Sequence, residues 1–82
     1  MSFYVYILKS IEKKPVTYVG YTINLSKRIK QHNDGKGAKF TRGRKWKLIY
    51  KEKCNTKNQA ILREYYIKNN RKLRNLIKAN NK

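Results

Sequence analysis

The chain has 82 residues, of which 22 are Lys or Arg and only 4 are Asp or Glu, so its formal net charge is +18. This length suffices for one domain with a small core, and the single cysteine, Cys54, excludes an internal disulfide and a multi-cysteine zinc site. The apolar run at the N-terminus is too short for a signal peptide or a membrane span, so we expect a cytoplasmic protein.

The excess of positive charge needs an explanation, because charges of one sign on so small a body repel one another strongly. A polyphosphate partner supplies one, since each phosphate neutralised by Lys or Arg releases condensed counterions. The alternatives are a solubilising surface and an anionic membrane surface, although no expected helix pairs a bulky apolar face with a clean basic one. The composition therefore favours DNA or RNA as the partner.

The hydrophobic pattern predicts two strands at the start of the chain. Residues 3–8 form a continuous run of β-formers, which is typical of a strand covered on both faces. Residues 9–15 are a polar connection with the only proline, and residues 16–22 are rich in β-branched and aromatic side chains. Together these segments indicate a hairpin with a moderately long loop.

A helix, a basic loop and a third strand are expected next. Asn24 is suited to cap a helix over residues 25–33. Residues 34–45 contain three glycines and are rich in Lys and Arg, which indicates a basic loop. Residues 46–53 alternate well enough between apolar and polar side chains to predict a strand.

The second long helix has clear signals at both ends. Thr56 and Gln59 form a capping box at its start. The helix is expected to extend to about residue 69, where Asn69 and Asn70 are suited to stop it in the left-handed conformation.

The end of the chain predicts a short amphipathic helix built on Leu73, Leu76 and Ile77, followed by a frayed basic tail at about residues 78–82. The order is ββαβαα over a single domain of residues 1–82. The sequence therefore predicts an α+β fold, in which a small three-stranded antiparallel sheet packs against helices.

Each of the two expected strands carries a tyrosine, and in the second strand a glycine shares its face. Tyr6 lies on one face of the first strand, and Tyr18 and Gly20 share a face of the second. Because glycine weakens a strand, its place beside a phenol indicates close approach by a ligand or by backbone. The alternative is that these tyrosines are half-buried sheet residues.

The first helix carries an unusual polar pair. Leu25, Arg28, Ile29 and His32 fall within one arc of about 100°. The apolar members must face the sheet, which draws Arg28 and His32 toward it. A lone histidine is more often structural or merely exposed than catalytic. An arginine and a histidine at i, i+4 on the core-facing edge are less ordinary, but the pair alone leaves both interpretations open.

Glu64 is a carboxylate among apolar neighbours. Ala60, Ile61 and Ile67 lie at i−4, i−3 and i+3. Burial of a carboxylate costs several kcal/mol unless it is paired or bound to metal, so Glu64 is a candidate Mg²⁺ ligand. The alternative is an i, i+4 pair with Lys68. The spacing leaves both interpretations open.

Taken in order, these positions resemble the motifs of the GIY-YIG nuclease superfamily over essentially the whole chain. Residues 4–6 (Tyr-Val-Tyr) stand where the family has its first motif, and residues 18–20 (Tyr-Val-Gly) match the second. Residues 24–32 look like the family's helix with an essential Arg and a nearby His, and Glu64 matches its metal-binding acid. Residues 35–44 are similar to the loop of small stand-alone bacterial (YhbQ-like) members.

The chain departs from the family's pattern at two points. The first motif begins Tyr-Val instead of Gly-Ile, which leaves Tyr6 in place. The family often has a further polar residue, commonly Asn, after the metal-binding Glu. Asn69 and Asn70 are the candidates for it.

The resemblance implies a metal-dependent endonuclease that hydrolyses DNA phosphodiester bonds, with a single Mg²⁺ (or Mn²⁺) ion on Glu64. Arg28 would hold the scissile phosphate, while Tyr6 and Tyr18 would position or deprotonate the attacking water near His32. The ordinary pKa of a phenol is about 10, and we expect the basic surroundings to favour the phenolate. Which tyrosine is the base does not follow from the sequence.

Four side chains of the basic loop are the expected phosphate contacts, namely Lys36, Lys39, Arg42 and Arg44. The alternative is a mobile, solvated loop. Phe40 and Trp46 have rings that could stack on bases, although Trp46 is better suited to anchor the third strand.

Larger relatives owe their specificity to appended domains, so we expect this chain to recognise the shape of branched or damaged DNA, or to use a partner protein or self-association. The alternative is a non-catalytic DNA- or RNA-binding module that keeps the nuclease fold. Glu64 argues against that alternative, because binding alone would not require it. A basic interaction or ribosome-associated protein is supported by charge alone.

Overall fold

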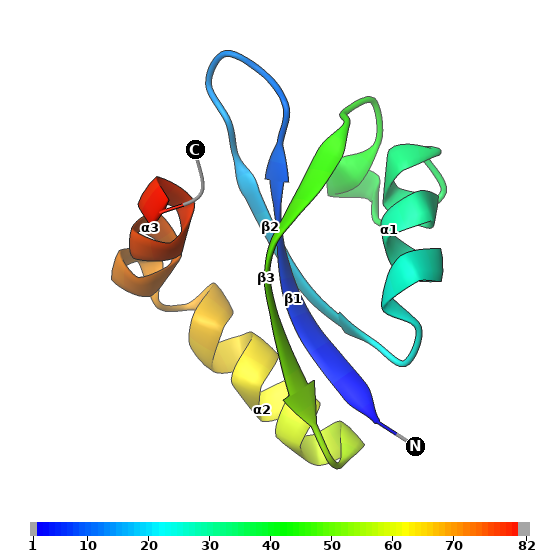
Figure 1. The fold of residues 1–82 in the computed structure, drawn as a ribbon, viewed down its shortest axis with the longest axis vertical. Helices are drawn as coiled ribbons and strands as arrows, with labels where there is room; N and C mark the ends of the chain where they lie inside the picture. The colour runs from blue at the N-terminus through cyan, green and yellow to red at the C-terminus, as the bar shows by residue number, and fades with distance from the viewer. Residues whose placement is uncertain (1, 81–82) are drawn as a thin grey trace.

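The computed structural model describes residues 2–80. Its elements follow the expected order, with one short 3₁₀ turn added inside the basic loop (Figure 1). They are β1 (Phe3–Ser10), β2 (Thr17–Thr22), α1 (Leu25–Asn33), η1 (Lys39–Thr41), β3 (Trp46–Cys54), α2 (Lys57–Lys68) and α3 (Arg71–Asn80). The predicted α+β fold is confirmed. No helix within the described range is both long and apolar enough to cross a lipid bilayer.

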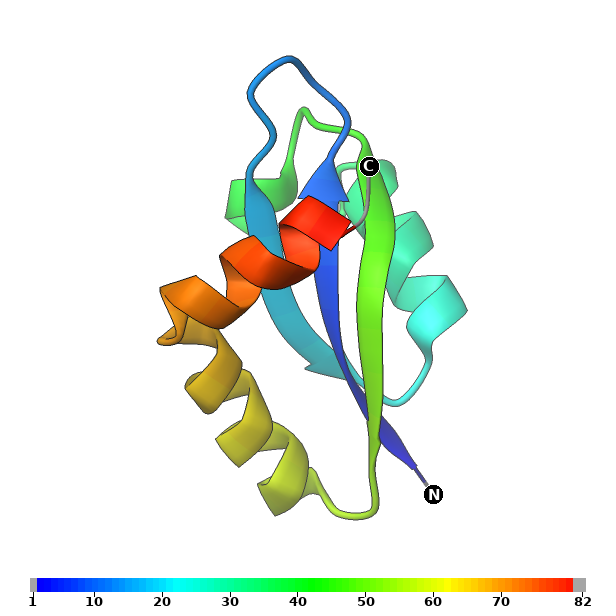
Figure 2. The ribbon, with the colours of Figure 1, turned by 60° about the vertical axis from the view of Figure 1, so that its left-hand side comes forward.

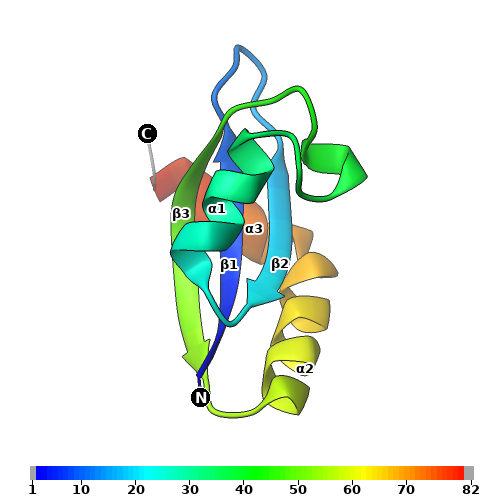
Figure 3. The ribbon, with the colours of Figure 1, turned by 90° about the vertical axis from the view of Figure 1, so that its right-hand side faces the viewer.

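The sheet is antiparallel, and its strand order β2-β1-β3 places β1 in the centre. α2 and α3 cross one face of it (Figure 2), whereas α1 lies on the opposite face (Figure 3). A central strand covered on both faces explains the unbroken apolar run of β1, whose residues 5–8 are all fully buried.

Alternation along the strands divides the core into two parts. On the α1 face, Tyr6, Leu8 and Trp46 are buried beneath Leu25 and Ile29 of the helix. The opposite face packs against α2 and α3, and its buried residues are Val5, Ile7, Val19, Ile49, Cys54, Ala60 and Ile67.

A register shift between β1 and β3 allows neighbouring residues of β3 to pack in the two different parts of the core. Ile7 pairs with Tyr50, but Leu8 pairs with Leu48, so Ile49 is an extra residue on β3. Because of this bulge, Ile49 joins the core beneath α2 and α3, and Leu48 packs on the α1 side.

Both predicted helix starts are confirmed. The Asn24 side chain accepts a hydrogen bond from the Lys27 amide at 3.1 Å, and the Thr56 hydroxyl accepts one from the Gln59 amide at 3.1 Å. The Gln59 side chain reaches back to the Asn55 amide at 3.0 Å, one residue before the cap.

The prediction that Asn69 and Asn70 end α2 in the left-handed conformation is wrong. Asn69 has φ −94° and ψ 5°, and within residues 2–80 only glycines have positive φ. The Asn70 side chain accepts a hydrogen bond from the Leu73 amide at 3.0 Å, so it caps α3. α3 begins directly after α2, and this junction needs a cap for the next helix in place of a stop for the previous one.

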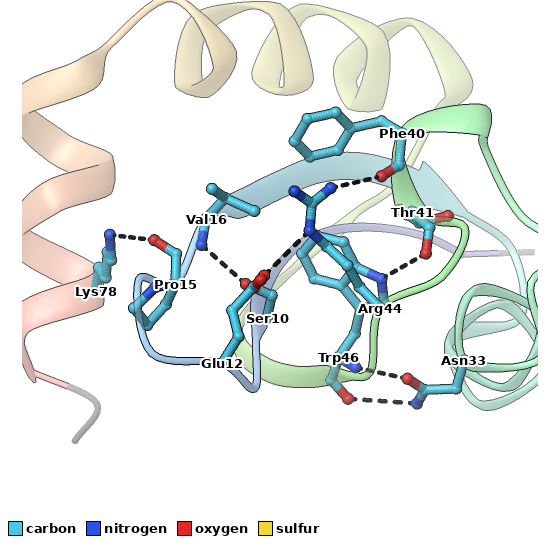
Figure 4. A network of polar contacts seen from close by, with 10 residues as sticks. All are labelled: Ser10, Glu12, Pro15, Val16, Asn33, Phe40, Thr41, Arg44, Trp46 and Lys78. Carbon is cyan, nitrogen blue, oxygen red and sulfur yellow. Dashed lines mark hydrogen bonds and ion pairs between the residues drawn. The ribbon is translucent and has the colours of Figure 1, made fainter.

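α3 continues to Asn80, although we expected fraying from about residue 78. Lys78 donates a hydrogen bond to the Pro15 carbonyl at 2.8 Å, which ties the helix to the β1–β2 loop (Figure 4). Residues 81 and 82 lie outside the described residues.

Candidate active site

Tyr6 and His32 form the centre of the candidate site. Tyr6 stands opposite Gly20 in the β1–β2 register, and its hydroxyl lies 2.8 Å from Nε2 of His32 on α1. Both side chains are buried, with exposed fractions of 1% and 0%. The helical arc that drew His32 toward the sheet therefore brings it to a strand tyrosine 26 positions earlier.

Gly20 makes room for this pair. A Cβ atom at Gly20 would lie 2.6 Å from the Tyr6 hydroxyl oxygen and 3.2 Å from a ring carbon of Tyr18. The close approach expected at this glycine is real, but the neighbour is the Tyr6 phenol and not a ligand or backbone.

Tyr18 lies beside the buried pair and is half-buried. Its ring centroid is 5.0 Å from that of His32 and 6.4 Å from that of Tyr6. Phe40 of η1 packs almost parallel to it, at 6.3 Å and 20°. The two predicted tyrosines therefore share one site, with Tyr6 inside and Tyr18 closer to solvent.

Arg28 connects the buried phenol to a surface hollow. It lies near enough to the Tyr6 phenol to lower the pKa of that group, and its Nη1 donates to Gln31 Oε1 at 3.2 Å. The hollow has a volume of about 410 Å³, and it is lined by Tyr21, Thr22, Ile23, Asn24, Lys27, Arg28 and Gln31. A guanidinium at such an opening is suited to bind a phosphate.

The pKa of Tyr6 moves against the sequence-based expectation. Burial raises it to about 12, and Arg28 opposes this rise without overcoming it. The pKa of His32 is lowered to about 4, first by burial and then by the charge of Arg28. Both groups are therefore neutral at pH 7.

Glu64 lies on α2, which runs along the β2 side of the sheet (Figure 3). Its side chain is 20% exposed, and Lys68 Nζ lies 3.3 Å from Oε1, so the i, i+4 pair is present. Its charge is close enough to Tyr6 to contribute to the raised pKa of that phenol. The carboxylate is thus half-enclosed and within electrostatic range of the buried pair.

A single carboxylate is compatible with Mg²⁺, because this ion keeps several waters and is often held by one or two carboxylates together with substrate phosphates. Within residues 2–80, no three side chains of His, Cys, Asp or Glu gather as a metal cage. The donor set therefore fits an ion whose coordination is completed by substrate. Asn69 and Asn70 use their side chains at the α2–α3 junction.

The basic loop contributes to the site in a way that its charges did not indicate. The hydroxyl of Thr41 lies 2.9 Å from Nδ1 of His32, and a Cβ atom at Gly37 would lie 2.3 Å from the same nitrogen. Both contacts join residues apart in the chain, and no local sequence pattern indicates them. The loop thus encloses the His32 ring.

The four predicted phosphate-binding residues differ in their surroundings. Arg44 donates to Glu12 Oε2 at 3.0 Å and to the Phe40 carbonyl at 3.2 Å (Figure 4). Lys36, Lys39 and Arg42 are exposed. Arg44 therefore holds the loop against the β1–β2 connection, and the other three present their charges to solvent.

Trp46 anchors β3, as expected. It is 4% exposed, and its indole nitrogen donates to the Thr41 carbonyl at 3.0 Å. Its backbone amide donates to Asn33 Oδ1 at 2.6 Å, and the Asn33 amide donates back to its carbonyl at 3.3 Å (Figure 4). Asn33, which the sequence did not single out, therefore fixes the end of α1 to β3.

These elements and their shared site define a class of protein. Residues 2–78 match the GIY-YIG catalytic domain, and the chain belongs to this family of nucleases. The solution NMR structure of the UPF0213 protein BH0048 from Bacillus halodurans has the same fold, with a TM-score of 0.55 and 40% identity. That similarity covers 96% of this chain and 85% of the other.

Within the family, the chain is similar to further UPF0213 proteins. It is 58% identical to CPE1444 of Clostridium perfringens over 66 residues, which are 79% of this chain and 69% of that protein. It is 54% identical to YazA of Bacillus subtilis over 52 residues, or 62% and 52% of the two chains.

Proposed function

We propose that the chain is a metal-dependent endonuclease that hydrolyses DNA phosphodiester bonds. The observation that carries the proposal is the convergence of Tyr6, Tyr18, Arg28 and His32, which come from three elements, with the charge of Glu64 within range. A chain of net charge +18 has the electrostatics to hold such a polyanion.

Arg28 binds the scissile phosphate in this proposal. Its planar fork of donors matches two phosphoryl oxygens, and the hollow that it helps to line is where the DNA backbone would lie. A guanidinium already held by Gln31 needs little reorganisation when charge develops on the phosphate.

The two tyrosines divide the work on the attacking water. Tyr6 keeps its proton at neutral pH, because burial raises its pKa to about 12, so it orients the water through its oxygen. Tyr18 is half-buried beside it and is the proposed base, which takes the proton of the water as a phenolate and becomes a phenol.

Glu64 is the residue that would hold Mg²⁺ or Mn²⁺, and Lys68 would give up its contact to the ion. The bound ion supplies Lewis-acid stabilisation of the phosphoryl and leaving oxygens. The paired carboxylate is also the observation that favours a second candidate, a DNA- or RNA-binding module without turnover.

The experiment that separates the candidates uses branched, nicked and linear DNA with Mg²⁺. We expect cleavage by the wild type, with branched or nicked DNA preferred, and loss of cleavage in Glu64→Ala and Arg28→Ala. Binding of all substrates without cleavage by the wild type would favour the binding module. Cleavage that survives both substitutions would identify a contaminant and reject the site.

A further inference from the structure

Thr41 has only one hydroxyl hydrogen and two close partners. Its Oγ1 lies 2.8 Å from the Ala38 carbonyl oxygen and 2.9 Å from Nδ1 of His32. A carbonyl oxygen can only accept, so the Thr41 hydrogen is donated to Ala38. Toward His32 the Thr41 oxygen must then accept, which places a hydrogen on Nδ1.

The other end of the imidazole follows from this assignment. A neutral imidazole carries one hydrogen, so Nε2 is an acceptor, and the Tyr6 hydroxyl 2.8 Å away donates to it.

The Nε2–H tautomer of His32 would form one hydrogen bond fewer with its buried partners. With the hydrogen on Nε2, Thr41 could donate to Nδ1 or to Ala38 but not to both. Thr41 and His32 are both 0% exposed, so water cannot replace the missing hydrogen bond. The imidazolium form would satisfy every partner, but burial and Arg28 lower the pKa of His32 to about 4.

The loop holds Thr41 and the ring in place. The Trp46 indole donates to the Thr41 carbonyl at 3.0 Å, and the Thr41 amide donates to Ala38 at 3.0 Å. Gly37 lies against the ring so closely that one added methyl group would overlap Nδ1. The basic loop is therefore a support for His32 as well as a carrier of charge.

We propose that Thr41 is a positioning residue of this site, which holds His32 as the Nδ1–H tautomer and so directs the Tyr6 hydroxyl hydrogen away from the substrate. The Tyr6 oxygen then offers only lone pairs to the site. A water molecule would donate to it and turn its own lone pair toward the phosphorus. This last consequence rests on the proposed function, whereas the tautomer does not.

The tautomer can be measured directly, because His32 is the only histidine. In a ¹⁵N-labelled protein at pH 7, long-range proton–nitrogen correlations should show a pyrrole-type Nδ1 and a pyridine-type Nε2. Thr41→Val should lose this pattern, and Thr41→Ser should restore it. Thr17→Val, which removes a hydroxyl from β2, is the control and should retain it.

An Nε2–H tautomer or an imidazolium in the wild type would overturn the proposal, and so would an unchanged pattern in Thr41→Val. The wild-type spectrum and Thr41→Ser keep the test decisive if Thr41→Val fails to fold. In cleavage assays, Thr41→Val should lower kcat on the order of tenfold with little change in KM, and Thr41→Ser should recover it.

Different results would defeat the two proposals. A wild type with the expected tautomer but without turnover on any DNA would defeat the proposed nuclease and leave the role of Thr41 in the tautomer standing. Full turnover in a Thr41→Val protein with altered tautomer would defeat the positioning role alone.

Discussion

His32 is expected to make the stability of the folded protein depend on pH between pH 7 and pH 5. Its pKa is about 4 in the folded chain, against about 6.5 in an unfolded one. Between these values the unfolded state binds more protons, so stability falls as the pH falls through the window. From pH 7 to pH 5 the expected loss is about 2 kcal/mol, measured by urea unfolding at both pH values.

His32→Gln is the control for this prediction. It should be less stable at pH 7, because it disturbs the hydrogen bonds with Tyr6 and Thr41, but its stability should change little between pH 7 and pH 5. Carboxylates with lowered pKa, such as Glu52 beside Arg63, lose their contribution only at lower pH. An equal loss in the variant and the wild type would contradict the assignment.

Gly20 is expected to tolerate no side chain. Gly20→Ala would place a methyl group 2.6 Å from the Tyr6 hydroxyl, which is held in the core by His32. We expect a destabilisation of about 1–3 kcal/mol in urea unfolding. In a Tyr6→Leu background the hydroxyl and the ring carbon Cζ, which would lie 2.8 Å from the same methyl group, are both gone, so the same change should cost less. Equal costs in both backgrounds would show that the close approach is unimportant.

At the scale of the elements, α2 carries Glu64, and its start depends on Thr56. Thr56→Ala removes the oxygen that accepts from the Gln59 amide and should cost about 1 kcal/mol of stability. Thr56→Ser keeps this oxygen and should stay near the wild type. Denaturant unfolding followed by circular dichroism measures both, and equal stability of all three proteins would rule out the cap as a contributor.

The elements that could be predicted from the sequence have local causes. Asn24 and Thr56 cap helices by accepting from amides three positions later, and such local hydrogen bonds are visible in the pattern. Asn70 was misassigned because a cap and a stop look alike until the next helix is placed. Asn69 does end α2 as its C-cap, but its φ is −94° and not left-handed.

In the candidate site, too, residues with a local sequence signal could be predicted, whereas contacts that depend on the tertiary fold could not. Strand alternation and the helical arc singled out Tyr6 and His32 before the family resemblance was drawn, and their 2.8 Å contact supports that choice. Gly37 and Thr41 were missed as partners of His32, because their contacts depend on how the loop folds over α1. The rise in the pKa of Tyr6 was missed too, since its depth of burial is a property of the packed core.

At the scale of the whole molecule, the charge predicts binding that weakens steeply with salt. Lys36, Lys39 and Arg42 are exposed on the basic loop. Replacing all three by Ala should reduce the slope of log K against log salt by up to about 0.9 for each phosphate that is no longer neutralised. Fluorescence anisotropy with duplex DNA, without divalent metal, measures this slope.

Lys13 and Lys14 are the control for that experiment, because they are exposed on the β1–β2 loop. A Lys13→Ala and Lys14→Ala protein loses similar charge outside the basic loop and should keep more of the wild-type slope. If both variants reduce the slope equally per charge, the basic loop has no special part in binding.

The central claim concerns Glu64, which is one of only 4 acidic residues in a chain that has 22 basic ones. Its proposed role is to hold the metal ion for phosphodiester hydrolysis. The most direct test compares the single-turnover cleavage rates of Glu64→Gln and Asp34→Asn on nicked DNA with Mg²⁺. Both changes raise the net charge by one, but Asp34 is an exposed partner of Lys30 at 2.7 Å. We expect a loss of about 100-fold or more for Glu64→Gln and a near wild-type rate for Asp34→Asn. Equal rates in the two variants would contradict the proposed role of Glu64.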